Sequence, residues 1–136
     1  MERIMERSLS AEEFDRCWPW LEASLEFAAF RHKGMMLPTH HKEHVWERIR
    51  TKRSMFWPGD DCALVTEFYM TPTSIKSHHT WLAGGDLQAI VAAMPAIEEW
   101  GRICECHQQT GSGRRGWLRA FEGYHEIGVR KAKPLI

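Results

Sequence analysis

Three side chains in the middle of the chain could accept a proton from a substrate. Glu67 lies in Cys62–Met70, a segment otherwise rich in apolar, β-branched and aromatic residues, and His78 and His79 follow in the next segment of this kind. Burial in apolar surroundings raises the pKa of a carboxyl group, as a general base working near neutral pH requires. Glu67 is therefore the candidate catalytic residue. The alternation of side chains along a strand leaves a second interpretation open, in which Glu67 faces solvent.

Two clusters contain residue types that bind metals, but neither has the spacing of an established site. In Cys104-Glu105-Cys106-His107 a single residue separates the cysteines, whereas zinc ligands are usually separated by about two to four residues. His40 and His44 lie one helical turn apart but lack the His-Glu-x-x-His pattern. We therefore predict no metal site. Without a recognisable secretion signal, four free thiols in a reducing compartment are expected: Cys17, Cys62, Cys104 and Cys106.

A glycine-containing segment connects an expected strand to an expected helix. It consists of Ala83, Gly84, Gly85, Asp86 and Leu87. Glycines let the backbone approach a ligand closely, and a helix N-terminus attracts anions, so these residues are the candidate cofactor-binding loop. The negative charge of Asp86 works against anion binding at this position. A tight turn that holds no ligand is the alternative interpretation.

The first part of the chain is expected to be helical. Ser10 and Glu13 have the spacing of a capping box, which predicts a helix from Ser10 toward Phe30, kinked or divided at Pro19. Gly34 ends this region. The next expected elements are a connector at Met35–Pro38 and a second helix at His40–Thr51, capped by Thr39.

The second part of the chain combines strands with a long helix. Apolar residues recur at helical spacing over Leu87–Cys104, where Asp86 can cap the helix and Pro95 should bend it. A short helix is expected at Arg115–Glu122. The predicted strands are Met55–Trp57, Cys62–Met70, Ile75–Leu82, a weak candidate at His107–Thr110, and Tyr124–Ala132.

The order of these elements predicts an α/β (α+β) fold. Its mixed, mainly antiparallel sheet would be flanked by helices. A length of 136 residues fits a single domain, with an N-terminal helical part at positions 1–53 and a sheet part at positions 54–136.

Composition limits the partners that the chain is expected to bind. With 18 basic and 18 acidic residues, no global electrostatic field favours nucleic acid, and no apolar run is long enough to span a membrane. The content of seven tryptophans is high, and such residues act as core anchors or as interface residues. We expect some of them in contacts with other protein chains. The first candidates are Trp18, Trp20 and Trp57.

The segment from Trp57 to Ile136 resembles the acyl-CoA-binding half of the GNAT (N-acetyltransferase) superfamily, most closely the small GNAT-like proteins encoded by tailed phages. The resemblance rests on the order of strand, glycine loop, helix, short strand, short helix and a final Gly-aromatic pair. In that family the loop follows the pattern Gln/Arg-x-x-Gly-x-Gly/Ala and holds the pyrophosphate of acetyl-CoA. Here Thr80 stands at the Gln/Arg position, Ala83 at the first glycine and Gly85 at the last position.

The resemblance also covers the C-terminal part of the motif. Gly123-Tyr124 matches the Gly-Phe pair of many GNAT enzymes, but Arg119 occupies the place of the tyrosine that can protonate the CoA thiolate. Arginine cannot act as that acid, because its pKa exceeds about 12. In an active member Glu67, His78 or His79 would be the base for the amine substrate.

The resemblance implies two alternative functions. One is an acetyl-CoA-dependent N-acetyltransferase that acts on an unknown amine. The other is a scaffold derived from this family that has lost cofactor binding and serves as a structural or assembly component of a phage virion. The loop and Arg119 favour the second, which predicts no cofactor, other protein chains as partners (virion proteins or a second copy), and a location in the virion or the host cytoplasm.

Overall fold

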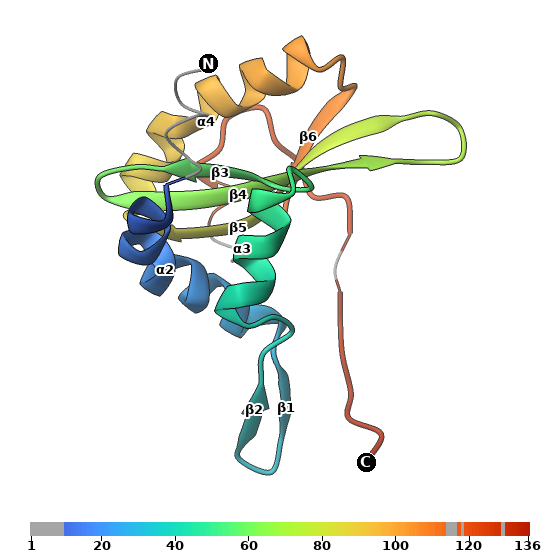
Figure 1. Cartoon of the computed structure of the whole chain (residues 1–136). Helices are drawn as coiled ribbons and strands as arrows, with labels where there is room; N and C mark the ends of the chain where they lie inside the picture. Colours follow the sequence, from blue (N-terminus) through green and yellow to red (C-terminus); the bar gives the residue numbers. More distant parts are fainter. Residues whose placement is uncertain (1–9, 114–116, 118, 129) are drawn as a thin grey trace.

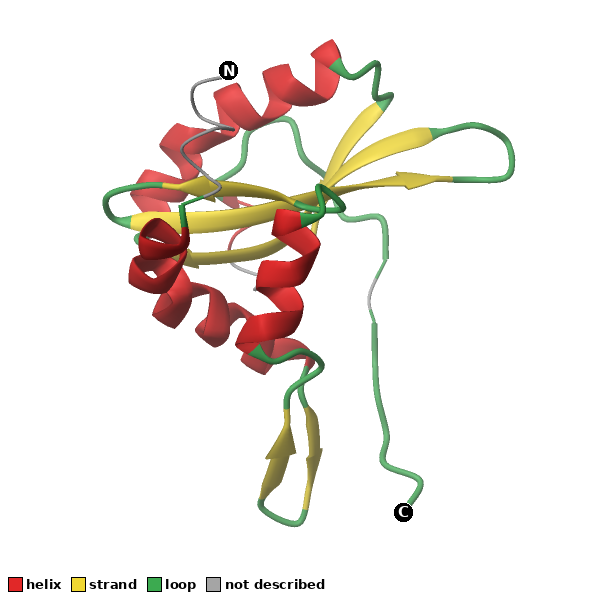
Figure 2. Cartoon of the chain, in the orientation of Figure 1, coloured by secondary structure: helices red, strands yellow, loops and turns green. Residues whose placement is uncertain are grey.

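The computed structural model describes residues 10–113, 117, 119–128 and 130–136, and shows a mixed four-stranded sheet between two layers of helix (Figures 1 and 2). The helices α2 (Ala11–Leu25) and α3 (Lys42–Arg50) cover one face, and α4 (Leu87–Ile103) covers the other. This arrangement confirms the predicted α+β fold. The strands, in their order across the sheet, are β3 (Met55–Pro58), β4 (Cys62–Met70), β5 (Lys76–Gly85) and β6 (Gln108–Gly111).

Three of the four strands form an antiparallel meander, and the fourth is parallel to its neighbour. β4 has the predicted bounds, and β3 and β6 agree with their predictions to within one residue. β6 pairs in parallel with the first part of β5, from Ser77 to Thr80. The intervening helix α4 provides the crossover that a parallel pair of strands requires. No helix within the described ranges has the length and apolar character needed to cross a membrane.

A β-bulge in β5 decides which side chains face which helical layer. Val65 pairs with Leu82 and Thr66 pairs with Thr80, so Trp81 is an extra residue in β5. The extra residue reverses the alternation of side chains beyond it. As a result Leu82 joins the core beneath α2 and α3, together with Val65, and the next residue, Ala83, joins the core beneath α4.

Helix α2 begins as predicted but is shorter. The Ser10 hydroxyl accepts a hydrogen bond from the Glu13 N–H over 3.4 Å. The Glu13 carboxylate does not complete a capping box and pairs with Arg16 at 2.6 Å. The helix continues through Pro19 as one element, and a short 3-10 helix, η1 (Glu26–Ala28), follows it. Of the two alternatives predicted at Pro19, a kink or a division, the division is therefore wrong.

The expected connector after Gly34 is instead a β-hairpin that projects from the α2 and α3 layer (Figure 1). Its strands are β1 (Phe30–His32) and β2 (Met35–Leu37). The two residues between them, Lys33 and Gly34, have φ values of 49° and 77°. Positive φ at both central residues is the geometry of a type I′ turn, whose twist matches that of a hairpin.

Helix α3 starts later than predicted and uses a different N-terminal residue. His41 precedes the helix, and its backbone N–H donates to Nδ1 of His44 over 2.8 Å. Thr39, the predicted cap, bonds instead to the ring of His40. A histidine ring nitrogen here takes the place of the usual carboxylate or hydroxyl acceptor.

The predicted C-terminal strand Tyr124–Ala132 is not formed by its described residues, 124–128 and 130–132; residue 129 lies outside the described part. The Tyr124 hydroxyl donates to Glu98 of α4 over 2.5 Å, which directs the chain along the helix rather than along the sheet edge. The described residues that follow, 125–128 and 130–136, are exposed. Within the short helix expected at Arg115–Glu122, the described residues form a turn in which the Ala120 N–H donates to the Trp117 carbonyl.

Trp57 belongs to the core and not to a contact surface. Its side chain is buried, and its indole N–H donates to the Thr66 hydroxyl over 2.9 Å. The expectation that Trp57 lies in an interface is therefore wrong. Trp18 and Trp20 are half-buried and pack against the core from the α2 side.

His78 makes the stability of the fold depend on pH. It is fully buried, Gln109 Oε1 lies 2.8 Å from its Nδ1, and burial lowers the pKa of the imidazole below its ordinary value of 6.5. The unfolded chain therefore binds more protons than the folded chain below about pH 6.5, so the free energy of unfolding should fall as the pH drops through this range. Urea unfolding between pH 7.5 and pH 5 should show this decline, with a smaller slope in His78→Gln.

The exposed His125 provides the matched control, because His125→Gln removes an imidazole that the fold does not bury. This variant should keep the slope of the unmodified chain. Equal slopes in His78→Gln and His125→Gln would contradict the role of His78. Some slope should remain in His78→Gln, because burial also lowers the pKa of His40 and His79.

Candidate functional site

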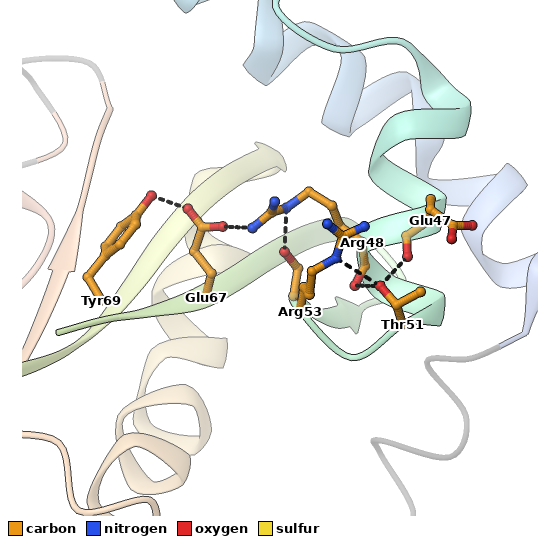
Figure 3. A network of polar contacts seen from close by, with 7 residues as sticks. Glu47, Arg48, Thr51, Arg53, Glu67 and Tyr69 are labelled. Carbon is orange, nitrogen blue, oxygen red and sulfur yellow. Dashed lines mark hydrogen bonds and ion pairs between the residues drawn. The ribbon is translucent and has the colours of Figure 1, made fainter.

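An ion pair joins α3 to the centre of the sheet (Figure 3). Glu67 is only 5% exposed and turns toward α3, where the Arg48 guanidinium donates to its Oε2 over 2.8 Å. The Tyr69 hydroxyl donates to the other carboxylate oxygen, Oε1. Nε of Arg48 donates to the Ser54 hydroxyl over 3.1 Å, which fixes the orientation of the guanidinium. We call Arg48, Glu67 and Tyr69 the carboxylate clasp.

The geometry of the clasp explains why the Tyr69 phenol keeps its proton. Glu67 and Tyr69 are two residues apart on one strand, so their side chains share a face. Burial, followed by the hydrogen bond to Glu67, raises the pKa of Tyr69 to about 12. The phenol is therefore a permanent donor at neutral pH, and both oxygens of Glu67 are occupied. A carboxylate bound in this way holds α3 to the sheet.

Two histidines and Trp81 extend the clasp along the same face of the sheet. The His79 ring lies 5.2 Å from the Tyr69 ring, and its Nδ1 is 2.8 Å from the Thr110 hydroxyl of β6. The Trp81 ring lies 4.8 Å from the His40 ring and 5.6 Å from the Arg48 guanidinium. Burial lowers the pKa of both histidines, and the nearby charge of Arg48 acts in the same direction on His40.

The three proton acceptors expected from the sequence thus separate into two groups. Glu67 and His79 pair across β4 and β5 and face α3. His78 turns to the opposite face, where its ring lies 5.2 Å from that of Phe68 beneath α4. The alternative interpretation, in which Glu67 faces solvent, is wrong because the residue is buried. The structure therefore places one carboxylate, Glu67, and one imidazole, His79, side by side on the same face of the sheet.

The expected cofactor-binding loop is not a loop. Ala83, Gly84 and Gly85 are the last residues of β5 and pair with Leu64, Ala63 and Cys62 of β4. Only one residue, Asp86, separates the strand from α4. The predicted strand end at Leu82 was therefore too early. The glycines continue the sheet instead of forming a cradle.

The N-terminus of α4 is already occupied by the chain itself. The Asp86 carboxylate accepts a hydrogen bond from the Ala89 N–H over 3.0 Å, and the Asp86 N–H donates to the Asp61 carbonyl over 2.8 Å. Asp86 thus caps the helix as predicted, and its negative charge takes the position that an anionic ligand would need. Leu87 is the first residue of the helix and is half-buried.

The two glycines are required by contacts between segments of backbone. A Cβ on Gly84 would clash with the Trp20 carbonyl of α2, and a Cβ on Gly85 would clash with the Asp61 carbonyl. Gly85 also has a φ of 106°, which disfavours other residues. The Ala83 N–H donates to the Ser24 hydroxyl of α2 over 3.0 Å. Helix α2 therefore covers the part of β5 that would face a cofactor.

The possible metal ligands stay apart. His40 and His44 have ring centroids 6.3 Å apart, and in the described part of the chain no three His, Cys, Asp or Glu side chains gather into a site. His107 accepts from the Lys76 N–H through Nδ1, so its ring supports the start of β5. Burial raises the pKa of Cys104 and Cys106, which disfavours the thiolate that metals bind. All four cysteines are free thiols, as expected.

Sequence reasoning missed Arg48 and Tyr69. Tyr69 carried a usable signal, because residues two apart on a strand share a face with Glu67. Arg48 carried none, since it lies 19 positions from Glu67 and on a separate element. Ser24 and Trp20, which cover the end of β5, could likewise be found only from the tertiary structure.

Comparisons with known proteins add one structural similarity. No family model and no curated protein sequence matches the chain. Among solved structures, the chain is similar to the tetramutant of the BH1408 protein from Bacillus halodurans, with 16% sequence identity and a TM-score of 0.48. The similarity covers 98% of this chain and 88% of that chain.

Removing one partner of the carboxylate clasp should be strongly destabilising. Replacing Arg48 by Met leaves a buried carboxylate without its counter-ion, which should lower the free energy of unfolding by about 3 kcal/mol in urea titrations. Replacing both Arg48 and Glu67 by Met should restore part of the loss, because no unpaired charge remains. The ion pair between Arg50 and Glu47 on the same helix is exposed, and Arg50→Met should cost less than about 0.5 kcal/mol. Similar costs for Arg48→Met and Arg50→Met would disprove the role of the clasp.

Proposed function

We propose that this chain is a GNAT-derived scaffold of a tailed phage, without cofactor binding, which works through contacts with other protein chains as a virion or assembly component. One observation carries the proposal. The segment that would hold the pyrophosphate is the paired end of β5, closed by Asp86 at one end and by Trp20 and Ser24 at its side. An anion there would have to displace a strand pairing, a helix cap and a helix.

Exposed apolar side chains outside the core support the second half of the proposal. β2 carries Met35, Met36 and Leu37, each about half exposed, and the C-terminal segment carries Ile127 at 71% and Leu135 at 93%. Large apolar residues that gather at exposed positions mark surfaces for other proteins. The zero formal net charge adds no self-repulsion against association.

The alternative function, an acetyl-CoA-dependent N-acetyltransferase, is favoured by one feature. The buried Glu67 and the half-buried His79 lie close to the bulge at Trp81, and β6 pairs with β5 only as far as Thr80. Bulges are frequent beside active sites, and among the described residues no strand pairs with that edge of β5 beyond Thr80. The occupation of both Glu67 oxygens by Arg48 and Tyr69 counts against a role as base.

Titration with acetyl-CoA separates the two functions. Isothermal calorimetry of the full chain should give no saturable heat corresponding to a dissociation constant below about 1 mM. Asp86→Ser keeps a side chain that can cap α4 and removes the charge. This variant should likewise not bind acetyl-CoA, because the end of β5 stays paired with β4. Micromolar binding by the unmodified chain would overturn the proposal and favour the transferase, and binding by Asp86→Ser alone would show that only the charge closes the site.

The location in a particle is tested independently. Quantitative mass spectrometry of purified particles from the phage that encodes this chain should detect it at a copy number typical of a structural component. A phage enzyme that is not packaged serves as the control for contamination. Recovery of the chain only from the lysate supernatant, with none in the particles, would refute the virion assignment.

A further inference from the structure

The β1–β2 hairpin has one apolar face and a cationic character. Phe30 pairs with Leu37 and His32 with Met35, so these four side chains share one face, while Arg31 and its partner Met36 lie on the other. An isolated two-stranded hairpin is at best marginally stable in water, and contact with another surface stabilises it. The hairpin extends away from the sheet and its helices (Figure 1). It is therefore an arm with its apolar face available to a partner.

The charge of this arm selects the kind of partner. The chain has no acidic residue between Glu26 and Glu43, whereas Arg31 and Lys33 lie in the hairpin itself. The complementary surface must therefore combine apolar contact with negative charge. The arm and a fitting surface would attract each other at a distance and then exclude water from the apolar face.

Such a surface exists on the chain itself, between α2 and α3. A hollow of about 250 Å³ is lined almost entirely by apolar surface from Ala11, Phe14 and Trp46, with Asp15, Lys42 and Glu43 at its rim. Lys42 is paired with Asp15 at 2.7 Å, which leaves Glu43 as the charge not offset within the rim. The exposed Glu12 of α2, next to Ala11 in the chain, adds to the negative character of the neighbouring surface.

We propose that the β1–β2 hairpin of one copy docks on the hollow between α2 and α3 of a second copy, with the contact made reciprocally. Met35 or Leu37 fills the apolar hollow, and Lys33 faces Glu43 across the contact. The hairpin lies in the chain between α2 and α3, the helices that line the hollow (Figure 1). In a dimer with a two-fold axis, each copy would present its hairpin to the hollow of the other. A reciprocal contact of this kind closes into a dimer instead of growing into a filament. This inference rests on the proposed function, since it identifies one of the protein partners.

Self-association of the full chain tests the proposal. Sedimentation velocity over a concentration series should show a dimer for the unmodified chain. Leu37→Glu places a charge on the docking face and should weaken dimerisation at least tenfold. Met70→Glu is the matched control, because Met70 is 62% exposed at the other side of the molecule, in the tip of the β4–β5 hairpin, and its replacement should leave the dimer unchanged. Circular dichroism confirms that each variant is folded.

A charge exchange identifies the docking surface. Lys33→Glu and Glu43→Lys should each weaken the dimer, and the double variant should restore it to within about threefold of the unmodified chain. A monomer at all concentrations, or a double variant weaker than either single one, would overturn the proposal. Hairpin-dependent binding of duplex DNA or of anionic vesicles by a monomeric chain would also overturn it. The outcome with acetyl-CoA is a separate result, so a failure of this dimer and a failure of the non-enzymatic function can be told apart.

Discussion

The extra residue in β5 is the constraint on which the rest of the structure depends. Without the bulge at Trp81, strict alternation would place Leu82 beneath α4 and Ala83 beneath α2. The bulge gives the bulky Leu82 to the core of α2 and α3 and the small Ala83 to the side of α4. Because of the bulge, His79 and Leu82 lie on the same side of β5 although three positions separate them. His79 and its partner Glu67 face α3, and Leu82 joins the core under α2 and α3. One inserted residue therefore determines which side chains enter the core under each helical layer. It also determines which polar side chains of the sheet face α3.

The position of α2 follows from the next two residues of that strand. Gly84 has no side chain, so the backbone of α2 approaches β5 until the Trp20 carbonyl lies against it, and Ser24 then reaches the Ala83 N–H. The second helix of this layer is held by a different means, the Arg48–Glu67 ion pair. A buried ion pair contributes less to net stability than to the choice of one arrangement, because its partners are costly to separate and cannot pair elsewhere. Close backbone packing fixes α2, and the clasp fixes α3.

The sequence was sufficient for the features that depend on local patterns. β4, α4 and the caps at Ser10 and Asp86 are correct because periodicity and capping residues act within a few positions. The β1–β2 hairpin could not be predicted in this way, because its strands have three residues each and its turn is Lys-Gly instead of the more typical Asn-Gly. The strand expected at Tyr124–Ala132 was wrong because the bond from Tyr124 to Glu98 spans 26 positions. Of the candidate site, Glu67 and His79 were found, whereas Arg48 required the tertiary structure.

A glycine pair between a strand and a helix has two physical meanings, which the sequence cannot distinguish. Glycine allows backbone to approach a ligand, and it equally allows backbone to approach backbone. In this chain both glycines have the second use: Gly84 lies against α2, and Gly85 lies against Asp61 with a φ that other residues disfavour. The pattern that resembles a phosphate-binding loop therefore has a complete explanation in packing. An anion site would require the same two residues to be free of those contacts, and the layer of α2 would then have to move away from the sheet.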